Sequence, residues 1–200
     1  MNVIIDYKVG NIGSISRGLE RAGIEAKISS EASDIEQADI LFLPGVGAFK
    51  DAMQDLEKTG LIPLIKTHVK NGKLLVGICL GMQLLFDSST EYGQTEGLGF
   101  ITGNVIYLDI NKKVPHMGWN ELLFNQEDNI LKNINESDYV YFVHSYYADT
   151  PSENVIAYTD YEINIPAIVR KDNVIGMQFH PEKSGQVGLK LLQAIKEMGQ

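Results

Sequence analysis

The first half of the chain alternates between two hydrophobic patterns. Short apolar runs at residues 3–7, 24–29, 40–43 and 74–78 have the length of buried strands. Between these runs, apolar residues recur every three or four positions, which is the spacing of an amphipathic helix. The predicted helices cover residues 12–22, 49–56, 61–69 and 80–86. This alternation is typical of a parallel sheet that helices cover on both faces.

The second half of the chain consists mainly of strand-like segments. They cover residues 105–108, 121–124, 139–147, 155–159, 167–169 and 174–179. Short polar turns join them, so we expect hairpins and edge strands, followed by one last helix with Leu191 and Ile195 on its inner face. The predicted fold class is α/β, a mostly parallel central sheet flanked by helices, with extra antiparallel strands. No linker or internal repeat interrupts residues 1–200, so we expect a single domain.

The charge of the chain narrows the classes of partner. Against 26 Asp and Glu there are 17 Lys and Arg, a formal net charge of −9. Such a surface repels the phosphates of nucleic acids and of anionic membranes, so we expect neither as a partner. One cysteine cannot form an internal disulfide, and the strand-like residues 2–6 do not resemble a secretory signal. We therefore expect a cytoplasmic location.

A cysteine stands between the apolar run 74–78 and a predicted helix. Gly77 and Gly81 flank Cys79 two residues to either side, which is the cysteine form of a nucleophile elbow. In such an elbow a strained turn lifts the nucleophile above the sheet, and the glycines let other backbone approach. The helix N-terminus favours a thiolate, and the Leu80 N–H can stabilise an oxyanion. The alternative is that Cys79 is one more buried small hydrophobe.

A cysteine nucleophile needs a base, and the chain has four histidines. His68 lies near the end of a predicted amphipathic helix, which favours a surface position. His180 follows the apolar run 174–179, at a strand end, where the sites of open sheets gather. Glu182 lies two residues further on the same side of an extended chain, so its carboxylate can fix the imidazole tautomer. If another histidine is the base, His144 is the first alternative.

Gly45, Val46 and Gly47 follow another apolar run. Glycines at a strand end free the backbone to aim N–H groups at a ligand, although Pro-Gly after a strand is also a common turn. No phosphate-binding loop occurs, because the glycine pattern that begins at Gly97 lacks its third glycine. One cysteine and four scattered histidines show no zinc spacing. We therefore expect no cofactor and no metal.

Three of these motifs together resemble the class I (triad) glutamine amidotransferases. They are Gly-Ile-Cys-Leu-Gly-Met-Gln at residues 77–83, Phe-His-Pro-Glu at 179–182 and Pro-Gly-Val-Gly-Ala-Phe at 44–49. Within that family, the glutaminase subunits of imidazole glycerol phosphate synthase have segments similar to residues 115–121, 142–146 and 179–184. The resemblance covers about residues 3–195 and implies the flavodoxin-like fold of the family.

The resemblance implies a role for several residues. It makes Cys79 the nucleophile, His180 the base and Glu182 the group that orients the base. It places the oxyanion site at Gly45, Val46, Gly47 and Leu80. It assigns glutamine contacts to Gly47, Gln83, Glu91, His144, Ser145 and Tyr146. It places Asn11, Trp119, Tyr141 and Lys183 toward a partner subunit.

The residues themselves bear on four of these assignments. Gln83 lies one helical turn beyond Cys79 and so on the same helix face. Glu91 offers a carboxylate to the substrate ammonium group, with a solvated acidic loop as the alternative, and Trp119 is equally suited to a core. Lys8 departs from the family, which usually has glycine there. Lysine resists positive φ, so the loop before Asn11 and its docking are expected to differ.

The activity that the resemblance implies is hydrolysis of glutamine to glutamate and ammonia through a cysteine thioester. Ammonia would pass to a (β/α)₈-barrel cyclase in a heterodimer, which makes imidazole glycerol phosphate and AICAR in histidine biosynthesis. The alternative is the glutaminase of a paralogous amidotransferase acting on another substrate, such as a surface sugar. An intact triad disfavours a non-enzymatic regulatory homologue. Because Val46 lies between two glycines, its peptide can turn, and we expect the isolated chain to be nearly inactive without its partner.

Overall fold

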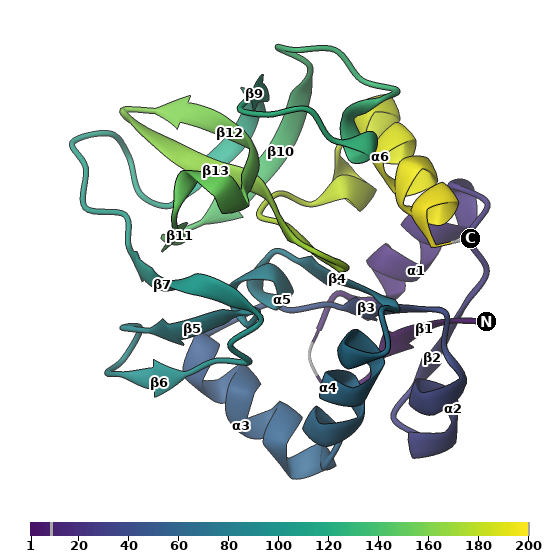
Figure 1. Ribbon diagram of the computed structural model, residues 1–200. Helices are drawn as coiled ribbons and strands as arrows, with labels where there is room; N and C mark the ends of the chain where they lie inside the picture. Colours follow the sequence, from purple (N-terminus) through teal and green to yellow (C-terminus); the bar gives the residue numbers. More distant parts are fainter. Residues whose placement is uncertain (9, 200) are drawn as a thin grey trace.

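The computed structural model describes residues 1–8 and 10–199, and an eight-stranded sheet forms its centre (Figure 1). In sheet order the strands are β2 (Ala26–Ser29), β1 (Asn2–Ile5), β3 (Ile40–Leu43), β4 (Leu74–Ile78), β14 (Val174–Met177), β13 (Ile163–Lys171), β12 (Val155–Tyr161) and β9 (Leu123–Phe124). The first five strands are parallel, and the last three continue the sheet in antiparallel pairing. The order of the parallel part is that of flavodoxin-like sheets, which confirms the predicted fold class.

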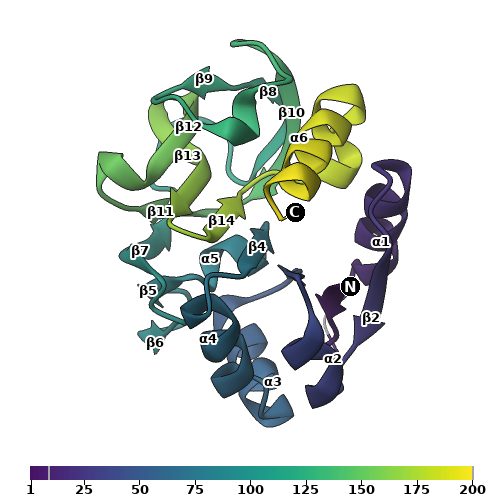
Figure 2. The same cartoon turned by 45° about the vertical axis from the view of Figure 1, so that its right-hand side comes forward.

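Helices cover both faces of the parallel strands. They are α1 (Ile12–Arg21), α2 (Ala32–Gln37), α3 (Phe49–Thr59), α4 (Ile62–Lys70), α5 (Leu80–Gln83) and α6 (Gly185–Met198), with short 3₁₀ turns η1 (Asn129–Leu131), η2 (Ser152–Asn154) and η3 (Pro181–Lys183). Figures 1 and 2 show α6 on the opposite side of the sheet from α3 and α4.

The alternation of side chains along the strands produces two separate cores. Ile4, Phe42 and Val76 pack in one buried cluster with Leu19 of α1 and Ile195 of α6. The intervening strand residues pack in a second cluster with α2, α3 and α4, and this cluster includes Ile5, Leu41, Leu75, Ile35, Leu56 and Ile65. Period-two alternation in strands buried on both faces requires apolar residues at every position, which explains the continuous apolar runs.

Two smaller groups of strands complete the fold. The strands β5 (Phe86–Ser89), β6 (Thr95–Glu96), β7 (Ile101–Tyr107) and β11 (Tyr146–Asp149) form a four-stranded sheet. The strands β8 (His116–Glu121) and β10 (Tyr139–His144) form an antiparallel pair. Both groups contribute to the site described below, because Glu91 lies between β5 and β6, and Val143, His144 and Tyr146 lie on β10 and β11.

Three predicted elements differ from the structure. The helix expected at residues 80–86 ends at Gln83, because the backbone of the next three residues bonds to residues 98–101 instead of continuing the helix. The run 139–147 is two strands, since β10 pairs with β8 and β11 pairs with β7 on either side of Ser145. The run 174–179 supplies β14, which forms the expected hairpin with β13 but is also parallel to β4, so it lies inside the sheet and is not an edge strand.

The predicted surface position of His68 is wrong. The side chain is buried, and its Nε2 bonds to the Leu74 carbonyl at 3.0 Å. Burial is the main cause that lowers the pKa of His68 below its usual value. The helix dipole argument failed here because α4 packs this residue against the start of β4.

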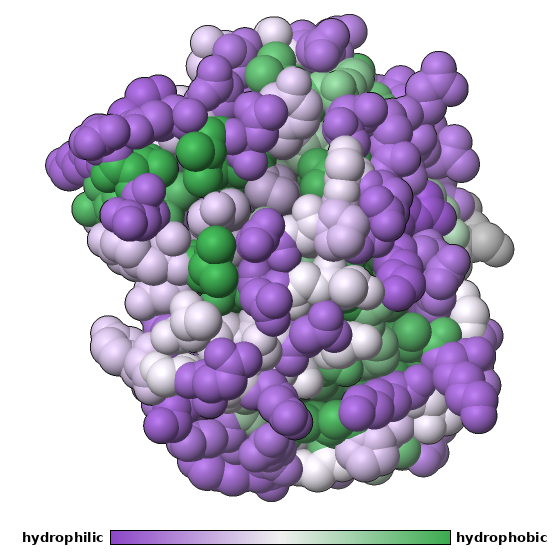
Figure 3. All heavy atoms as spheres, turned by 60° about the vertical axis from the view of Figure 1, so that its left-hand side comes forward, coloured by the Kyte–Doolittle hydropathy of each residue, from purple (hydrophilic) through white to green (hydrophobic). Residues whose placement is uncertain are grey.

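Most large apolar side chains are buried, and the face drawn in Figure 3 is mainly hydrophilic with hydrophobic side chains showing in separate areas. Among the described residues, the structure contains no helix that has both the length and the apolar character needed to span a membrane.

Candidate active site

Cys79 lies at the carboxyl end of β4, immediately before α5. Its backbone has φ 55° and ψ −114°, a conformation that non-glycine residues adopt only where the surrounding structure holds it. The Cys79 N–H donates to the Met177 carbonyl of the neighbouring β14 at 2.8 Å. The sulfur lies 4.0 Å from the Val143 carbonyl. The strand-to-helix elbow that the sequence predicts is therefore present.

Close backbone contacts explain the glycines around this elbow. A Cβ on Gly81 would lie 1.9 Å from the last carbonyl oxygen of β3, and a Cβ on Gly77 would lie 2.6 Å from the Gly81 oxygen. A Cβ on Gly45 would lie 2.6 Å from the Gly81 nitrogen. These distances are too short for any side chain, so the three glycines bring the segment after β3 into backbone contact with the elbow. Gly47, in contrast, has open space around it and φ 92°.

The order of strands places His180 beside Cys79. Because β4 and β14 are adjacent and parallel, with Ile78 opposite Met177, the residues that follow them emerge at the same edge of the sheet. His180 Nδ1 lies 2.9 Å from Glu182 Oε1, and the two side chains are only 2% and 1% exposed. The chain between them is not extended as expected. The 3₁₀ turn η3 carries the carboxylate back to the ring.

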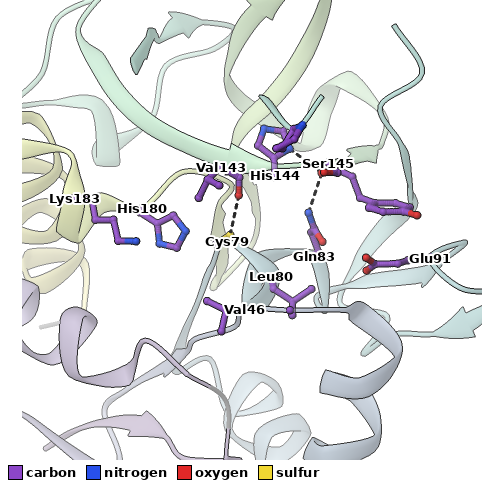
Figure 4. Close-up of a pocket in the computed structure, with 13 residues that line it drawn as sticks. Val46, Cys79, Leu80, Gln83, Glu91, Val143, His144, Ser145, His180 and Lys183 are labelled. Carbon is purple, nitrogen blue, oxygen red and sulfur yellow. Dashed lines mark hydrogen bonds between the residues drawn. The ribbon is translucent and has the colours of Figure 1, made fainter. Parts of the chain in front are cut away.

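The surroundings favour a charged His180–Glu182 pair. Burial alone lowers the pKa of His180, but its interactions with Cys79 and Glu182 outweigh burial and raise the pKa to about 9. Burial alone raises the pKa of Glu182, whereas hydrogen bonds from His180 and Asn11 bring it below its usual value. At neutral pH the ring is therefore an imidazolium, and Figure 4 shows it next to Cys79. An imidazolium beside a cysteine sulfur stabilises the thiolate.

Helix α1 supports Glu182 from the other side. Asn11 Nδ2 donates to Glu182 Oε1 at 2.9 Å, and Arg21 donates to the Glu182 carbonyl at 2.9 Å. A Cβ on Gly18 would lie 2.5 Å from Glu182 Cβ, so the helix approaches the carboxylate closely. Sequence reasoning had placed Asn11 only toward a partner. Its contact with Glu182 joins residues 171 positions apart and leaves no local signal in the sequence.

A pocket of about 440 Å³ opens in front of Cys79 (Figure 4). Most of the residues singled out from the sequence line it. They are Val46, Gly47, Cys79, Leu80, Gln83, Glu91, His144, Ser145, Tyr146, His180 and Lys183. Pro115 and Val143 also line the pocket and had not been singled out. Gly45 and Glu182 are not part of the lining, since Gly45 packs on the elbow and Glu182 bonds to His180.

Gln83 has a fixed orientation in the pocket wall. Its Nε2 donates to the Tyr146 carbonyl and to Gln178 Oε1, both at 3.0 Å. Because a carbonyl can only accept, the amide nitrogen must face Tyr146, and Gln83 Oε1 remains as an acceptor for a ligand. Gln178 is fully buried. The sequence gave no reason to select it, because its role comes from a partner 95 residues away.

Glu91 lies at the end of the pocket away from His180 (Figure 4). Its Oε2 accepts the Phe49 N–H at 2.7 Å. Burial is the main cause that raises the pKa of Glu91, and the nearby Asp51 adds to the rise. Among the described residues no lysine, arginine or histidine forms an ion pair with this carboxylate. A half-buried carboxylate without a cation is suited to an ammonium group of a ligand.

His144 has no free ring nitrogen. Its Nδ1 bonds to the Tyr146 carbonyl at 2.8 Å, and its Nε2 bonds to His116 Nδ1 at 2.9 Å. Burial is the main cause that lowers the pKa of His144 to about 3. The ring is therefore neutral and fully engaged, which disfavours His144 as the base for Cys79. Of the four histidines, His180 is the one whose ring bonds to a carboxylate.

The aromatic residues expected at a partner interface face each other across β8 and β10. Trp119 and Tyr141 are register partners, with ring centroids 6.1 Å apart in an edge-to-face arrangement. Trp119 is 55% exposed, so the alternative of a core position is wrong. Lys183 lies nearby on η3, at the rim of the pocket.

Lys8 adopts φ 69° although lysine disfavours positive φ. Its N–H donates to the Asp6 carboxylate at 3.0 Å, which compensates part of the cost. The loop before Asn11 therefore keeps a left-handed backbone at the position where the family usually has glycine.

Within residues 1–8 and 10–199, no three His, Cys, Asp or Glu side chains gather in a way that could hold a metal ion. The groups that converge on the pocket are instead a thiol, an imidazolium, a carboxylate and main-chain groups. Such a set can attack an acyl carbon, protonate a leaving group and bind an ammonium group.

Solved structures share this fold. A structure described as PurLQS from Thermotoga maritima has a TM-score of 0.80 and 20% identity, covering 98% of this chain and 97% of that one. A structure described as glutamine amidotransferase has a TM-score of 0.73 and 22% identity, covering 95% of this chain and 98% of that one. At these identities the likeness concerns the fold.

The sequence itself gives a closer likeness. An imidazole glycerol phosphate synthase subunit HisH from Caldanaerobacter subterraneus subsp. tengcongensis is 51% identical over 196 residues, covering 98% of this chain and 97% of the relative. The subunit of the same name from Listeria monocytogenes is 49% identical over 200 residues, covering 99% and 96%. The family model described as glutamine amidotransferase class-I matches residues 3–194. The chain therefore belongs to the class-I glutamine amidotransferase family.

Proposed function

We propose that this protein is the glutaminase subunit of an imidazole glycerol phosphate synthase, acting in histidine biosynthesis. The observation that carries the proposal is the charged His180–Glu182 pair beside Cys79 in an elbow built from glycine contacts. The choice of synthase is supported by relatives of 51% and 49% identity over nearly the whole chain, which are called HisH. Nothing comparable supports a paralogous amidotransferase for a surface sugar.

The first half-reaction releases ammonia. The Cys79 thiolate attacks the side-chain amide carbon of glutamine and forms a tetrahedral oxyanion. The imidazolium of His180 then gives its proton to the departing nitrogen as the carbon–nitrogen bond breaks. Ammonia leaves, and a thioester remains on Cys79. The raised pKa of His180 favours the proton being present when this step begins.

The second half-reaction restores the thiolate. His180, now neutral, takes a proton from a water molecule that attacks the thioester carbon. The carbon–sulfur bond breaks and glutamate leaves. Glu182 keeps one tautomer of the ring throughout, because its carboxylate holds the Nδ1–H.

The pocket fits the two ends of glutamine. We assign the substrate ammonium group to Glu91, whose half-buried carboxylate lacks a cation, and an N–H of the substrate to Gln83 Oε1. Gly47, Ser145 and Tyr146 would add contacts along the chain of the substrate. His144 would contribute through its backbone, since both ring nitrogens are engaged.

The oxyanion site is assigned to the Leu80 N–H and an N–H of the segment Gly45, Val46 and Gly47. Gly45 is held by the elbow, whereas Gly47 has open space, so a peptide between them can turn. Loss of one oxyanion donor typically costs about 10²–10³ in rate. We propose that a cyclase subunit with a (β/α)₈ barrel, docked near Asn11, Trp119, Tyr141 and Lys183, favours the productive orientation. Glutamate release should then rise stepwise from chain alone, to heterodimer, to heterodimer with nucleotide substrate.

We further propose that residues 1–200 act as one domain in the cytoplasm. A reducing compartment keeps the single thiol free for catalysis, which supports this location.

Cys79→Ala in the heterodimer tests the function. Formation of imidazole glycerol phosphate from glutamine should stop, while formation from added ammonium salt should continue, because ammonia bypasses the thioester. The control is the unmodified heterodimer in both assays. Retained glutamine-dependent synthesis in the variant would contradict the proposal.

A further inference from the structure

Two histidine rings that take no part in the proposed chemical steps are joined by a hydrogen bond at the pocket wall. His116 of β8 and His144 of β10 are register partners, and their rings meet through His116 Nδ1 and His144 Nε2 at 2.9 Å. Both residues are buried, at 2% and 7% exposure. A nitrogen-to-nitrogen hydrogen bond between buried rings requires one donor and one acceptor, so the two rings fix each other's protonation.

The direction of every bond in this group can be derived. The Tyr146 carbonyl can only accept, so His144 Nδ1 carries the proton and Nε2 is the acceptor. His116 Nδ1 must then donate, which leaves His116 Nε2 as an acceptor. Asn120 Nδ2 approaches that nitrogen at 3.4 Å, and Asn120 Oδ1 is occupied by the Glu121 N–H. One consistent chain of donors therefore runs from Asn120 through His116 and His144 to Tyr146.

This series of hydrogen bonds ends at the carbonyl oxygen of Tyr146, which also determines how Gln83 is oriented in the pocket wall. The Tyr146 carbonyl accepts from His144 and also from Gln83 Nε2 at 3.0 Å. That second bond sets which end of the Gln83 amide faces the pocket. Loss of the His116–His144 hydrogen bond would therefore affect the Tyr146 carbonyl and, through it, the orientation of the Gln83 amide in the pocket wall.

The ring of His116 is held by aromatic packing as well as by hydrogen bonds. It stacks between Phe142, with centroids 4.7 Å apart, and Tyr161, with centroids 4.0 Å apart, both at 25°. Stacking fixes the plane of the His116 ring but does not determine which ring nitrogen carries the proton. The hydrogen bond to His144 and the stacking can therefore be separated by substitution.

Building on the proposed glutaminase function, we propose that His116 is a positioning residue for glutamine binding, acting through His144 and the Tyr146 carbonyl on Gln83. It touches neither the substrate nor Cys79. Its loss should weaken glutamine binding more than it slows the chemical steps, because the His180–Glu182 pair lies outside this chain of bonds.

Two substitutions of His116 separate the bond from the stacking. His116→Phe keeps an aromatic ring between Phe142 and Tyr161 but removes the donor to His144. His116→Asn loses the stacking but places an amide N–H where the ring Nδ1 was. The readout is KM for glutamine and kcat of glutamate release by the heterodimer, with ammonium-dependent synthesis as the check on folding and assembly.

We expect His116→Phe to raise KM about tenfold, which is the effect of one lost buried hydrogen bond, with a smaller change in kcat. In His116→Asn, KM for glutamine should return to near the parental value. An unchanged KM in His116→Phe, or an Asn variant as impaired as the Phe variant, would overturn the proposal. If the Phe variant does not assemble, His116→Ala carries the test beside His116→Asn, since a KM that is raised in the Ala variant and restored in the Asn variant supports the series of donors, and equal KM values in both refute it. An unmodified heterodimer without glutaminase activity would instead refute the proposed function.

Discussion

The pocket is bordered by two buried histidine pairs with opposite electrostatics. In the His180–Glu182 pair, burial opposes charge, yet the pKa of His180 rises to about 9. In the His116–His144 pair, burial is the main cause that lowers the pKa of His116 to about 4 and of His144 to about 3. The bonds of the two pairs have the same length, 2.9 Å. What separates them is the chemistry of the neighbours, because His180 interacts with Cys79 and with the Glu182 carboxylate, whereas the rings of the second pair contact each other and a carbonyl.

A carboxylate stabilises a cationic ring more strongly than a neutral one, whereas an imidazole nitrogen or a carbonyl that accepts one N–H is satisfied by a neutral ring. One pocket therefore has a proton donor beside Cys79 and, in its wall, a histidine pair that stays neutral. We infer that the His180–Glu182 pair takes part in proton transfer and that the His116–His144 pair positions the pocket wall. The following predictions test this division.

The largest expected contrast is between the two pairs in turnover. His180→Asn should lower kcat for glutamine hydrolysis by about 10³-fold or more, because His180 moves the proton in both proposed half-reactions. His116→Asn, in the other pair, should leave kcat within about tenfold of the parent. The measurement is steady-state glutamate release by the heterodimer. A His180 variant that keeps a tenth of the parental kcat would break the comparison.

Glu182→Gln should lower kcat by about 10²–10⁴-fold, since a neutral amide cannot stabilise the imidazolium. The same change should move the alkaline limb of the kcat–pH profile to lower pH, because Cys79 still raises the pKa of His180 but the contribution of the Glu182 carboxylate is lost. Glu91→Gln is the matched control, as it neutralises a carboxylate that lines the pocket and does not bond to His180. It should raise KM and leave the pH profile in place. Identical profiles for Glu182→Gln and the parent would contradict the role of the carboxylate.

Asn11→Gly should reduce kcat about five- to tenfold. The change removes one hydrogen bond to a buried carboxylate, while glycine accepts the φ of 73°. Lys8→Gly provides the control, because Lys8 has φ 69° in the same loop and bonds to Asp6 rather than Glu182. Single-turnover release of ammonia would measure both. Equal rates in the two variants would show that the loop, and not the Asn11 side chain, matters.

The last expected contrast concerns stability, where turnover is not involved. The pKa of His180 is about 9 in the folded protein against an ordinary value of 6.5, so its contribution is complete below pH 6.5 and is lost as pH rises through 9. This loss is at most about 3 kcal/mol. The pKa values of His116 and His144 are depressed, so their contribution is present above pH 6.5 and is lost as pH falls toward 3.

The free energy of unfolding, measured with urea on the isolated chain at a series of pH values, gives the acidic and the alkaline side of the stability–pH profile. His180→Asn should flatten the alkaline side of the profile and also reduce the acidic slope, because Glu182 loses the neighbour that lowers its pKa. His116→Phe should reduce the slope of the acidic side alone. A His180 variant that keeps the alkaline slope, or a His116 variant that loses it, would refute the assignment of charge.

Much of this architecture is accessible from the sequence because it depends on local patterns. The apolar runs place the parallel strands, and the glycines around Cys79 predict the elbow. Since β4 and β14 both end at the same edge, the pairing of Cys79 with His180 follows once the sheet order is known. The end of α5 at Gln83 was missed, because backbone pairing with residues 98–101 overrides the helical spacing.

The supporting contacts could not be predicted in this way. The bond from Asn11 to Glu182 spans 171 residues, and the bond from His116 to His144 spans 28 residues across two paired strands. Each depends on where whole elements pack and leaves no periodicity or motif. His68 shows the same limit, since its burial depends on the packing of α4 against β4 and not on its place in the helix.

The most direct test of the division between the two pairs is a titration of the four histidine side chains by ¹H–¹⁵N NMR, with signals assigned from single His substitutions. The account predicts that His180 is cationic at pH 7 and loses its proton near pH 9, while His116 and His144 stay neutral down to below pH 5. The Nδ1-protonated tautomer is expected for His144. A His180 that titrates at or below pH 6.5, or a His144 that is cationic at neutral pH, would contradict it.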